Sequence, residues 1–253
     1  MRFTRATLGV ALLSLCALAG SPARAQQFNS DSYISKPHGM VTSILTTGEH
    51  TTMFMMTFSL FPNWEFTAAG YMFNTDADRT TAEGTQGSVY AKYMFYENAA
   101  KTGGFAVKGG GGMKPAYVLD GSGYQSSSVT WWMNAPATIP FFNNRLSWDI
   151  QPGFSVTPNA GGTGNDKWAF TYSTRLAWYP KGPVWAVVGE AFGAAGEAKL
   201  DPEYNVGLRY EPNAHVNIAI TYGAKFNGSP GQGFQIGAML FSPPFLCFSG
   251  CSK

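Results

Sequence analysis

Segments of alternating apolar and polar side chains recur along most of this chain, and that periodicity limits the folds it can adopt. The clearest segment covers residues 146–157. Its apolar face carries Leu146, Trp148, Ile150, Phe154 and Val156, and its polar face carries Ser147, Asp149, Gln151, Ser155 and Thr157. Because successive side chains of a β-strand point to opposite sides, the pattern predicts a strand with one apolar face. Its length, about ten residues, is what a tilted strand needs to cross a membrane.

The same alternation predicts about 12 strands after residue 38, and bacterial outer-membrane barrels have even strand numbers. The predicted strands cover residues 39–47, 51–61, 64–74, 87–96, 104–114, 128–140, 146–157, 167–179, 184–194, 203–211, 214–225 and 233–241. If the chain starts in the periplasm, the even-numbered connections are short and, after the first, the odd-numbered ones are longer. A soluble β-sandwich, the main alternative, has no reason to show that alternation. We therefore predict an all-β fold in which residues 39–241 form a closed antiparallel transmembrane β-barrel.

The tryptophans support the same fold. Six of the seven fall on the predicted apolar face, at strand ends: Trp64, Trp131, Trp148, Trp168, Trp178 and Trp185. Only Trp132 points to the other face. An indole ring has an apolar body and a polar N–H, so tryptophans at both ends of the strands predict the aromatic girdles of a membrane barrel.

The N-terminal residues indicate a secretory signal peptide. Arg2 and Arg5 precede an uncharged, mostly apolar stretch, residues 8–20, and residues 23–25 (ARA) have the small-x-small form of a cleavage site. We predict a signal peptide over residues 1–25, a periplasmic segment over 26–38, and a C-terminal tail over 242–253. A single transmembrane anchor is the alternative, but its apolar run would need about 20 residues. A lipoprotein attached at Cys16 is disfavoured because a leucine precedes that cysteine.

Charge excludes one class of partner. The full chain has 17 Lys and Arg against 15 Asp and Glu. Loss of three arginines with the signal peptide leaves 14 against 15, a net charge of −1, and no basic block remains. Nucleic-acid binding therefore has no electrostatic basis.

Export, abundant aromatic residues and no second long apolar run together predict the outer membrane of a Gram-negative cell. The expected partners are outer-membrane lipid and the barrel-assembly machinery.

No catalytic, metal or cofactor site is predicted. The three histidines are His38, His50 and His215; His50 falls in a predicted extracellular turn and His215 beside a periplasmic one, so those two cannot meet. The His-x-Ser arrangement of outer-membrane lipid hydrolases is absent. The glycines of residues 109–112 lack the Gly-Lys-Ser/Thr ending of a phosphate loop and predict a bend in a strand instead.

Two cysteines remain in the mature chain, Cys247 and Cys251. An exported protein folds in an oxidising compartment, so a disulfide between them is expected, with two free thiols as the alternative. Two thiols with no nearby histidine are too few ligands for a metal ion.

Charged residues on the polar faces predict a charged belt inside the barrel. The candidates are Lys92, Lys108, Asp149, Arg175, Glu190 and Arg209. If Thr157 pairs with Lys167, the antiparallel register places Asp149 opposite Arg175. Such charges either neutralise one another and fill the bore, or set a constriction with a preference for one sign of ion.

Three C-terminal segments carry a resemblance to a known family: residues 203–213 (EYNVGLRYEPN), 216–223 (VNIAITYG) and 234–241 (FQIGAMLF). They resemble the last three strands of the outer-membrane barrels named for the meta-pathway of phenol degradation. Residues 187–191 (VVGEA) are similar to a strand of that family which also carries an inward glutamate. The resemblance covers about the C-terminal half and implies a passage for small, often aromatic or apolar, compounds. One departure is that a tail follows Phe241, where such barrels usually end.

The sequence thus favours a passive, porin-like outer-membrane channel or transport pathway for small compounds, without naming the solute. A plugged barrel with a structural or surface-interaction role is the alternative. An outer-membrane lipid hydrolase is the third hypothesis.

We expect the mature protein to begin at Gln26, because signal peptidase cuts after a small-x-small sequence. Edman degradation of protein isolated from outer membranes checks this. Recovery of an intact Met1 would remove the argument for export.

Overall fold

β-Strands make up most of the described structure. The computed structural model describes residues 30–73, 84–112, 130–158 and 164–246. Its strands are β1 (Val41–Gly48), β2 (Thr51–Phe61), β3 (Trp64–Phe73), β4 (Gly84–Glu97), β5 (Gly104–Gly112), β6 (Trp131–Asn134), β7 (Ala137–Phe141), β8 (Leu146–Thr157), β9 (Lys167–Trp178), β10 (Trp185–Gly196), β11 (Leu200–Asn213), β12 (Val216–Lys225) and β13 (Pro230–Phe241). Each strand pairs antiparallel with its neighbours, and β1 pairs with β13.

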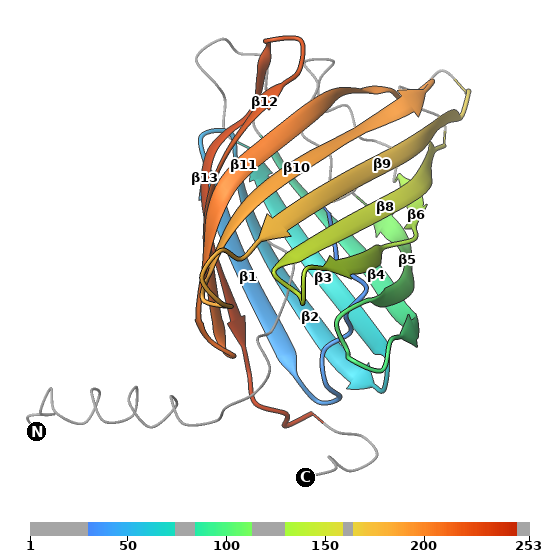
Figure 1. The fold of residues 1–253 in the computed structure, drawn as a ribbon. Helices are drawn as coiled ribbons and strands as arrows, with labels where there is room; N and C mark the ends of the chain where they lie inside the picture. The colour runs from blue at the N-terminus through green and yellow to red at the C-terminus, as the bar shows by residue number, and fades with distance from the viewer. Residues whose placement is uncertain (1–29, 74–83, 113–129, 159–163, 247–253) are drawn as a thin grey trace, which may run out of the picture.

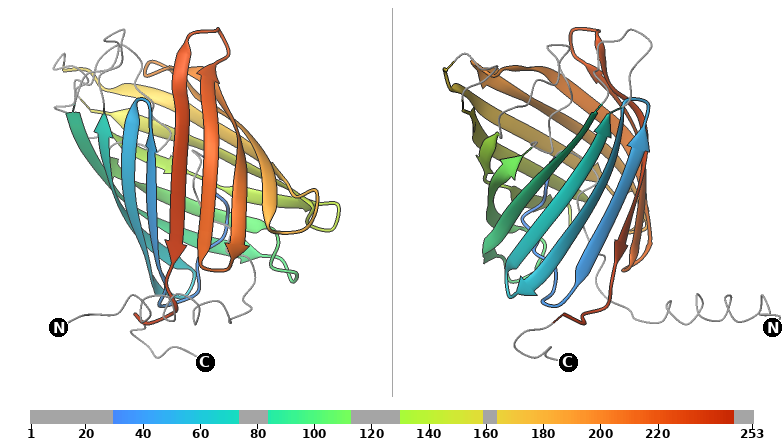
Figure 2. Two further views of the ribbon diagram at one scale, coloured as in Figure 1. Left: turned by 90° about the vertical axis from the view of Figure 1, so that its left-hand side faces the viewer. Right: turned by 180° about the vertical axis from the view of Figure 1, so that it is seen from behind.

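The sheet closes on itself (Figures 1 and 2). β6 and β7 lie end to end between β5 and β8 and act as one strand, so the fold is a closed antiparallel barrel of 12 strands, as predicted. The predicted strand over residues 128–140 is broken at Pro136, which has no N–H to donate to the ladder. Its carbonyl oxygen still accepts from the N–H of Ala106, at 2.9 Å.

The two faces of the wall have opposite polarity. In β8 the inward Ser147, Asp149 and Gln151 are buried, whereas Trp148 and Phe154 are exposed on the outer surface. The same arrangement holds in β11 and β12, where Leu208 and Ile220 are exposed and Arg209 and Thr221 are buried. An apolar exterior around a polar interior is the reverse of a soluble domain and suits a barrel surrounded by lipid.

Among the described residues, none belongs to a helix that is long and apolar enough to span a membrane.

The β10–β11 connection differs from expectation. The predicted loop over residues 195–202 is wrong, because β10 continues to Gly196 and β11 begins at Leu200. Leu200 is buried against Phe192 and Ala194, and this contact holds the two strands together beyond the predicted ends. A shift in register between Phe192 and Ala194 accompanies the extension. The alternation of long and short connections is therefore weaker than the sequence suggested.

The N-terminal segment also differs from expectation. We predicted that residues 26–38 lie in the periplasm, but the described part of this segment enters the barrel, where its backbone binds inward side chains of five strands. Figure 2 shows it inside the wall, leading into β1. The segment has no strand periodicity, and the polar inner wall offers partners for its N–H and C=O groups.

Replacing Leu208 with Arg should destabilise the barrel, because the side chain is 55% exposed on the outer, lipid-facing surface. The expected cost is about 2–4 kcal/mol if the residue lies at mid-bilayer depth. Thr221→Arg, a change on the inner face of the next strand, should cost less because that face carries other polar groups. Denaturant unfolding in lipid vesicles measures both, and equal costs would show that the assignment of the faces is wrong.

Candidate functional site

The six predicted lumen residues all lie on the inner wall. They come from β4, β5, β8, β9, β10 and β11, and their exposed fractions are 1–4%: Lys92, Lys108, Asp149, Arg175, Glu190 and Arg209. Charges buried this deeply need charged or hydrogen-bonding partners. The arrangement of those partners defines the site.

Asp149 and Arg175 face each other across β8 and β9, in the predicted register. The Nε and Nη2 atoms of Arg175 both donate to Oδ2 of Asp149, at 2.9 and 2.7 Å. The Thr138 hydroxyl donates to Oδ1 of the same carboxylate, at 2.5 Å. Because both partners are buried, removing either would take a close ion-pair partner from the other.

Arg209 has a partner that the sequence analysis missed. Its Nε lies 2.8 Å from Oε1 of Glu211, two residues along the same strand. The Tyr179 hydroxyl donates to that carboxylate at 2.9 Å and accepts a hydrogen bond from Arg209. The alternation of the predicted strands 203–211 and 167–179 places Glu211 and Tyr179 on the inner face, but it does not show that they meet.

Glu190 does not join Arg209. In the register it lies beside Arg175 on one side and Asn205 on the other. Its carboxylate accepts from Nδ2 of Asn205, at 3.0 Å, and from the backbone N–H of Ser30. The predicted belt is therefore a set of local clusters.

Lys92 and Lys108 meet at the N-terminal segment. Nζ of Lys92 lies 2.7 Å from Glu65 and 3.5 Å from Asp31, and Nζ of Lys108 lies 3.2 Å from Asp31. Burial alone would raise the pKa of the Asp31 carboxyl, but Lys108 and Lys92 outweigh it and lower the pKa to about 2. Asp31 is therefore ionised, and it places a negative charge between two lysines of the wall.

The backbone of the segment is bound along its length. The N–H groups of Asp31, Tyr33 and Lys36 donate to Gln151, Thr138 and Glu65, at 3.1, 3.3 and 2.7 Å. Lys92 donates to the carbonyl oxygen of Ile34, at 2.6 Å. Buried backbone groups are costly without partners, so these wall side chains hold the segment in the bore.

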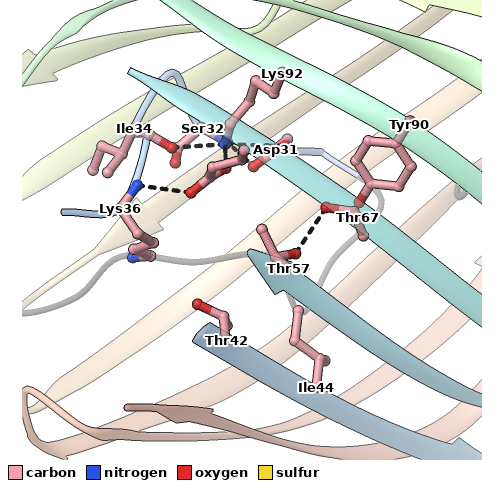
Figure 3. Close-up of a pocket in the computed structure, with 11 residues that line it drawn as sticks. Asp31, Ser32, Ile34, Lys36, Thr42, Ile44, Thr57, Thr67, Tyr90 and Lys92 are labelled. Carbon is pink, nitrogen blue, oxygen red and sulfur yellow. Dashed lines mark hydrogen bonds and ion pairs between the residues drawn. The ribbon is translucent and has the colours of Figure 1, made fainter. Parts of the chain in front are cut away.

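A small cavity lies beside the segment. A cavity of about 30 Å³ lies between it and the wall formed by β1–β4, lined by Asp31, Lys36, Tyr90 and Lys92 among others (Figure 3). A water molecule needs at least about 10–15 Å³, so the cavity holds about two.

Part of the inner wall is apolar, which the sequence analysis did not predict. Nine buried side chains form a cluster over β1–β4, β6 and β13: Met40, Ile44, Met55, Ala69, Tyr71, Tyr90, Trp132, Met239 and Phe241. The inward-pointing Trp132, the single exception to the tryptophan pattern, was the available signal. The inner wall over β1–β4 therefore carries an apolar and aromatic cluster as well as the charged pair of Glu65 and Lys92.

The other predicted residues lie elsewhere. All six girdle tryptophans point outward and are 37–56% exposed, namely Trp64, Trp131, Trp148, Trp168, Trp178 and Trp185; their contact with lipid stays a prediction. Cys247 and Cys251 lie outside the described residues, as does the proposed signal peptide. Within the described ranges, no group of His, Cys, Asp and Glu could hold a metal ion.

Comparison with known proteins finds solved structures that share the fold of this chain at low sequence identity. No family model matches the sequence, and no curated protein matches it. A KdgM porin is 12% identical, with a TM-score of 0.53, over 79% of this chain and 98% of that chain. The KdgM porin in complex with disordered oligogalacturonate is 11% identical, with a TM-score of 0.50, over 80% and 96%. The COG4313 outer membrane channel from Pseudomonas putida F1 is 9% identical, with a TM-score of 0.54, over 83% and 97%. This chain therefore has a barrel fold similar to that of solved porins and outer-membrane channels.

Proposed function

We propose that this protein is an outer-membrane channel, a passive pathway for small compounds, whose bore is narrowed by its own N-terminal segment. The observation that carries the proposal is the lining of the bore, where ionised and polar side chains from most strands face inward. A barrel of about 12 strands is wider than the eight-stranded barrels that side chains alone fill. Here a strand-free segment occupies that extra width, and a segment can leave while a packed core cannot.

The solved structures support this proposal, because those similar over almost their whole length are named as porins or channels. One of them is a complex with oligogalacturonate. The resemblance to the phenol-degradation barrels points to small aromatic compounds. The aromatic side chains of the inner wall fit such compounds, and membership of that family stays a prediction.

Lipid and the assembly machinery are the proposed macromolecular partners. The outward apolar residues provide the surface for lipid, and β13 ends in Phe241, an aromatic residue at the end of the last strand. The first tail residues bind the start of β1: the N–H of Ser242 donates to the carbonyl oxygen of Val41, at 2.9 Å. The tail therefore begins as a continuation of the closing seam.

The second candidate is a structural or surface-interaction barrel with a permanently closed bore. The N-terminal segment inside the bore and the small cavity beside it favour this candidate. A lipid hydrolase is less well supported, because His50 and His215 lie in turns at opposite ends of the barrel. We accordingly propose transport without catalysis.

Current through planar bilayers tests the channel. Asp149→Asn leaves the charge of Arg175 in the bore and should shift selectivity toward anions. Arg175→Gln leaves Asp149 and should shift it toward cations. Asp166→Asn changes an exposed residue directly before β9. It is the matched control and should leave the reversal potential unchanged.

Asp31→Asn should raise the conductance, because it removes the charge that binds the segment to Lys92 and Lys108. If the wild type, the selectivity variants and Asp31→Asn all pass no current while folded in the bilayer, the channel is excluded. The closed structural barrel then takes its place.

A further inference from the structure

Lys108 differs from the other cations of the bore in where its partner comes from. Lys92 has Glu65 on the wall, Arg175 has Asp149, and Arg209 has Glu211. Lys108 is 1% exposed, and the only carboxylate within ion-pair distance of it in the described part of the chain is Asp31. Asp31 belongs to the N-terminal segment, so the wall itself leaves this lysine uncompensated.

Two neighbours of Lys108 on the inner face of the sheet carry hydrogen-bond donors that have no partner among the described residues. Asn134 is opposite it in the β5–β6 register, and Trp132 follows on the same inward face. Nδ2 of Asn134 and Nε1 of Trp132 are buried without a hydrogen-bond partner among the described residues. The amide oxygen of Asn134 is already used by the Thr171 hydroxyl, so its free group is a donor. Buried donors usually have acceptors, so these two N–H groups are available to a ligand that reaches them.

An aromatic surface borders these donors. Tyr90 and Trp132 pack with ring centroids 5.1 Å apart, and the Lys108 ammonium lies 5.8 Å from the Tyr90 ring. Gly110 lies between the two rings in the register. Any side chain at Gly110 would collide with the Val89 carbonyl oxygen and with Tyr90. The glycine run noted in the sequence thus keeps this part of the wall clear.

We propose that Lys108, Asn134, Trp132 and Tyr90 form a binding site for a small aromatic carboxylate, and that Asp31 occupies the carboxylate position in this structure. The proposal rests on the channel function, since the solute would reach the site through the bore. The ligand carboxylate replaces the Asp31 carboxylate at Lys108, so the charge of the site is conserved. The free amide and indole N–H groups bind its oxygens, and its ring packs on Tyr90 and Trp132.

Equilibrium binding of radiolabelled benzoate to the full mature protein in detergent tests the site without requiring transport. Asp31→Asn removes the competing charge and should bind benzoate at least about tenfold more tightly than the wild type. Benzamide, which has the same ring and no charge, should not gain affinity. Equal benzoate binding by the wild type and Asp31→Asn would overturn the role of Asp31.

The cation and the indole are tested in the Asp31→Asn background. Adding Lys108→Gln should abolish the gain, and Lys108→Arg should retain most of it. Adding Trp132→Phe should weaken binding while keeping a ring in place. Lys167→Gln, which removes an exposed lysine at the start of β9, is the charge control and should have no effect.

Folding of each variant is checked by its heat-dependent shift in gel mobility. If Lys108→Gln binds benzoate as tightly as its folded parent, the site is excluded. Benzoate binding without any bilayer current would refute the channel and leave the site standing. Bilayer current without Lys108-dependent benzoate binding would refute the site and leave the channel standing.

Discussion

The charges buried on the inner wall must be compensated inside the barrel, and much of the described structure follows from that requirement. The outer surface is apolar, so ionised side chains can point only inward. On the side formed by β8, β9 and β11, the wall supplies its own pairs, as in Asp149 with Arg175 and Arg209 with Glu211. On β4 the wall supplies Glu65 for Lys92, whereas no wall carboxylate among the described residues lies within ion-pair distance of Lys108 on β5. Asp31 supplies the remaining negative charge, which explains why the N-terminal segment lies in the bore.

This division gives the two halves of the lumen different properties. On the side formed by β8, β9 and β11, the two ion pairs are made by wall residues alone and do not need the segment. The side carrying Lys108 changes when the segment leaves, because a buried ammonium without a counter-ion is costly. Water or an anion must then take the place of Asp31. The aromatic residues Tyr90 and Trp132 border that position, so an amphipathic anion satisfies both the charge and the adjoining apolar surface.

Local regularity explains how much of this could be predicted from sequence. Side-chain alternation predicts that every charged candidate points inward. Pairing Thr157 with Lys167 across one loop then predicts that Asp149 lies opposite Arg175. A slip of one residue would turn an apolar face inward, so this register is strongly specified. The N-terminal segment has no such regularity. Its contacts join Asp31 to residues 61 and 77 positions later, and Ser30 to a residue 160 positions later. No local pattern encodes these, although the odd inward placement of Trp132 marked the wall on which the site lies.

The contacts that hold the segment are of a kind that water can replace. Its N–H groups bind amide, hydroxyl and carboxylate oxygens of the wall rather than a continuous strand ladder. The net stabilisation from each such hydrogen bond is small when the freed groups can be hydrated, and ordering the segment costs conformational entropy. Its residence in the bore is therefore more readily reversed than the pairing of any wall strand, whose exposed backbone groups would face lipid. Lys36 is an added anchor, with its ammonium 4.5 Å from the Phe241 ring near the closing seam. Release is therefore expected to begin at Asp31, deeper in the bore, while the segment stays attached where it enters β1.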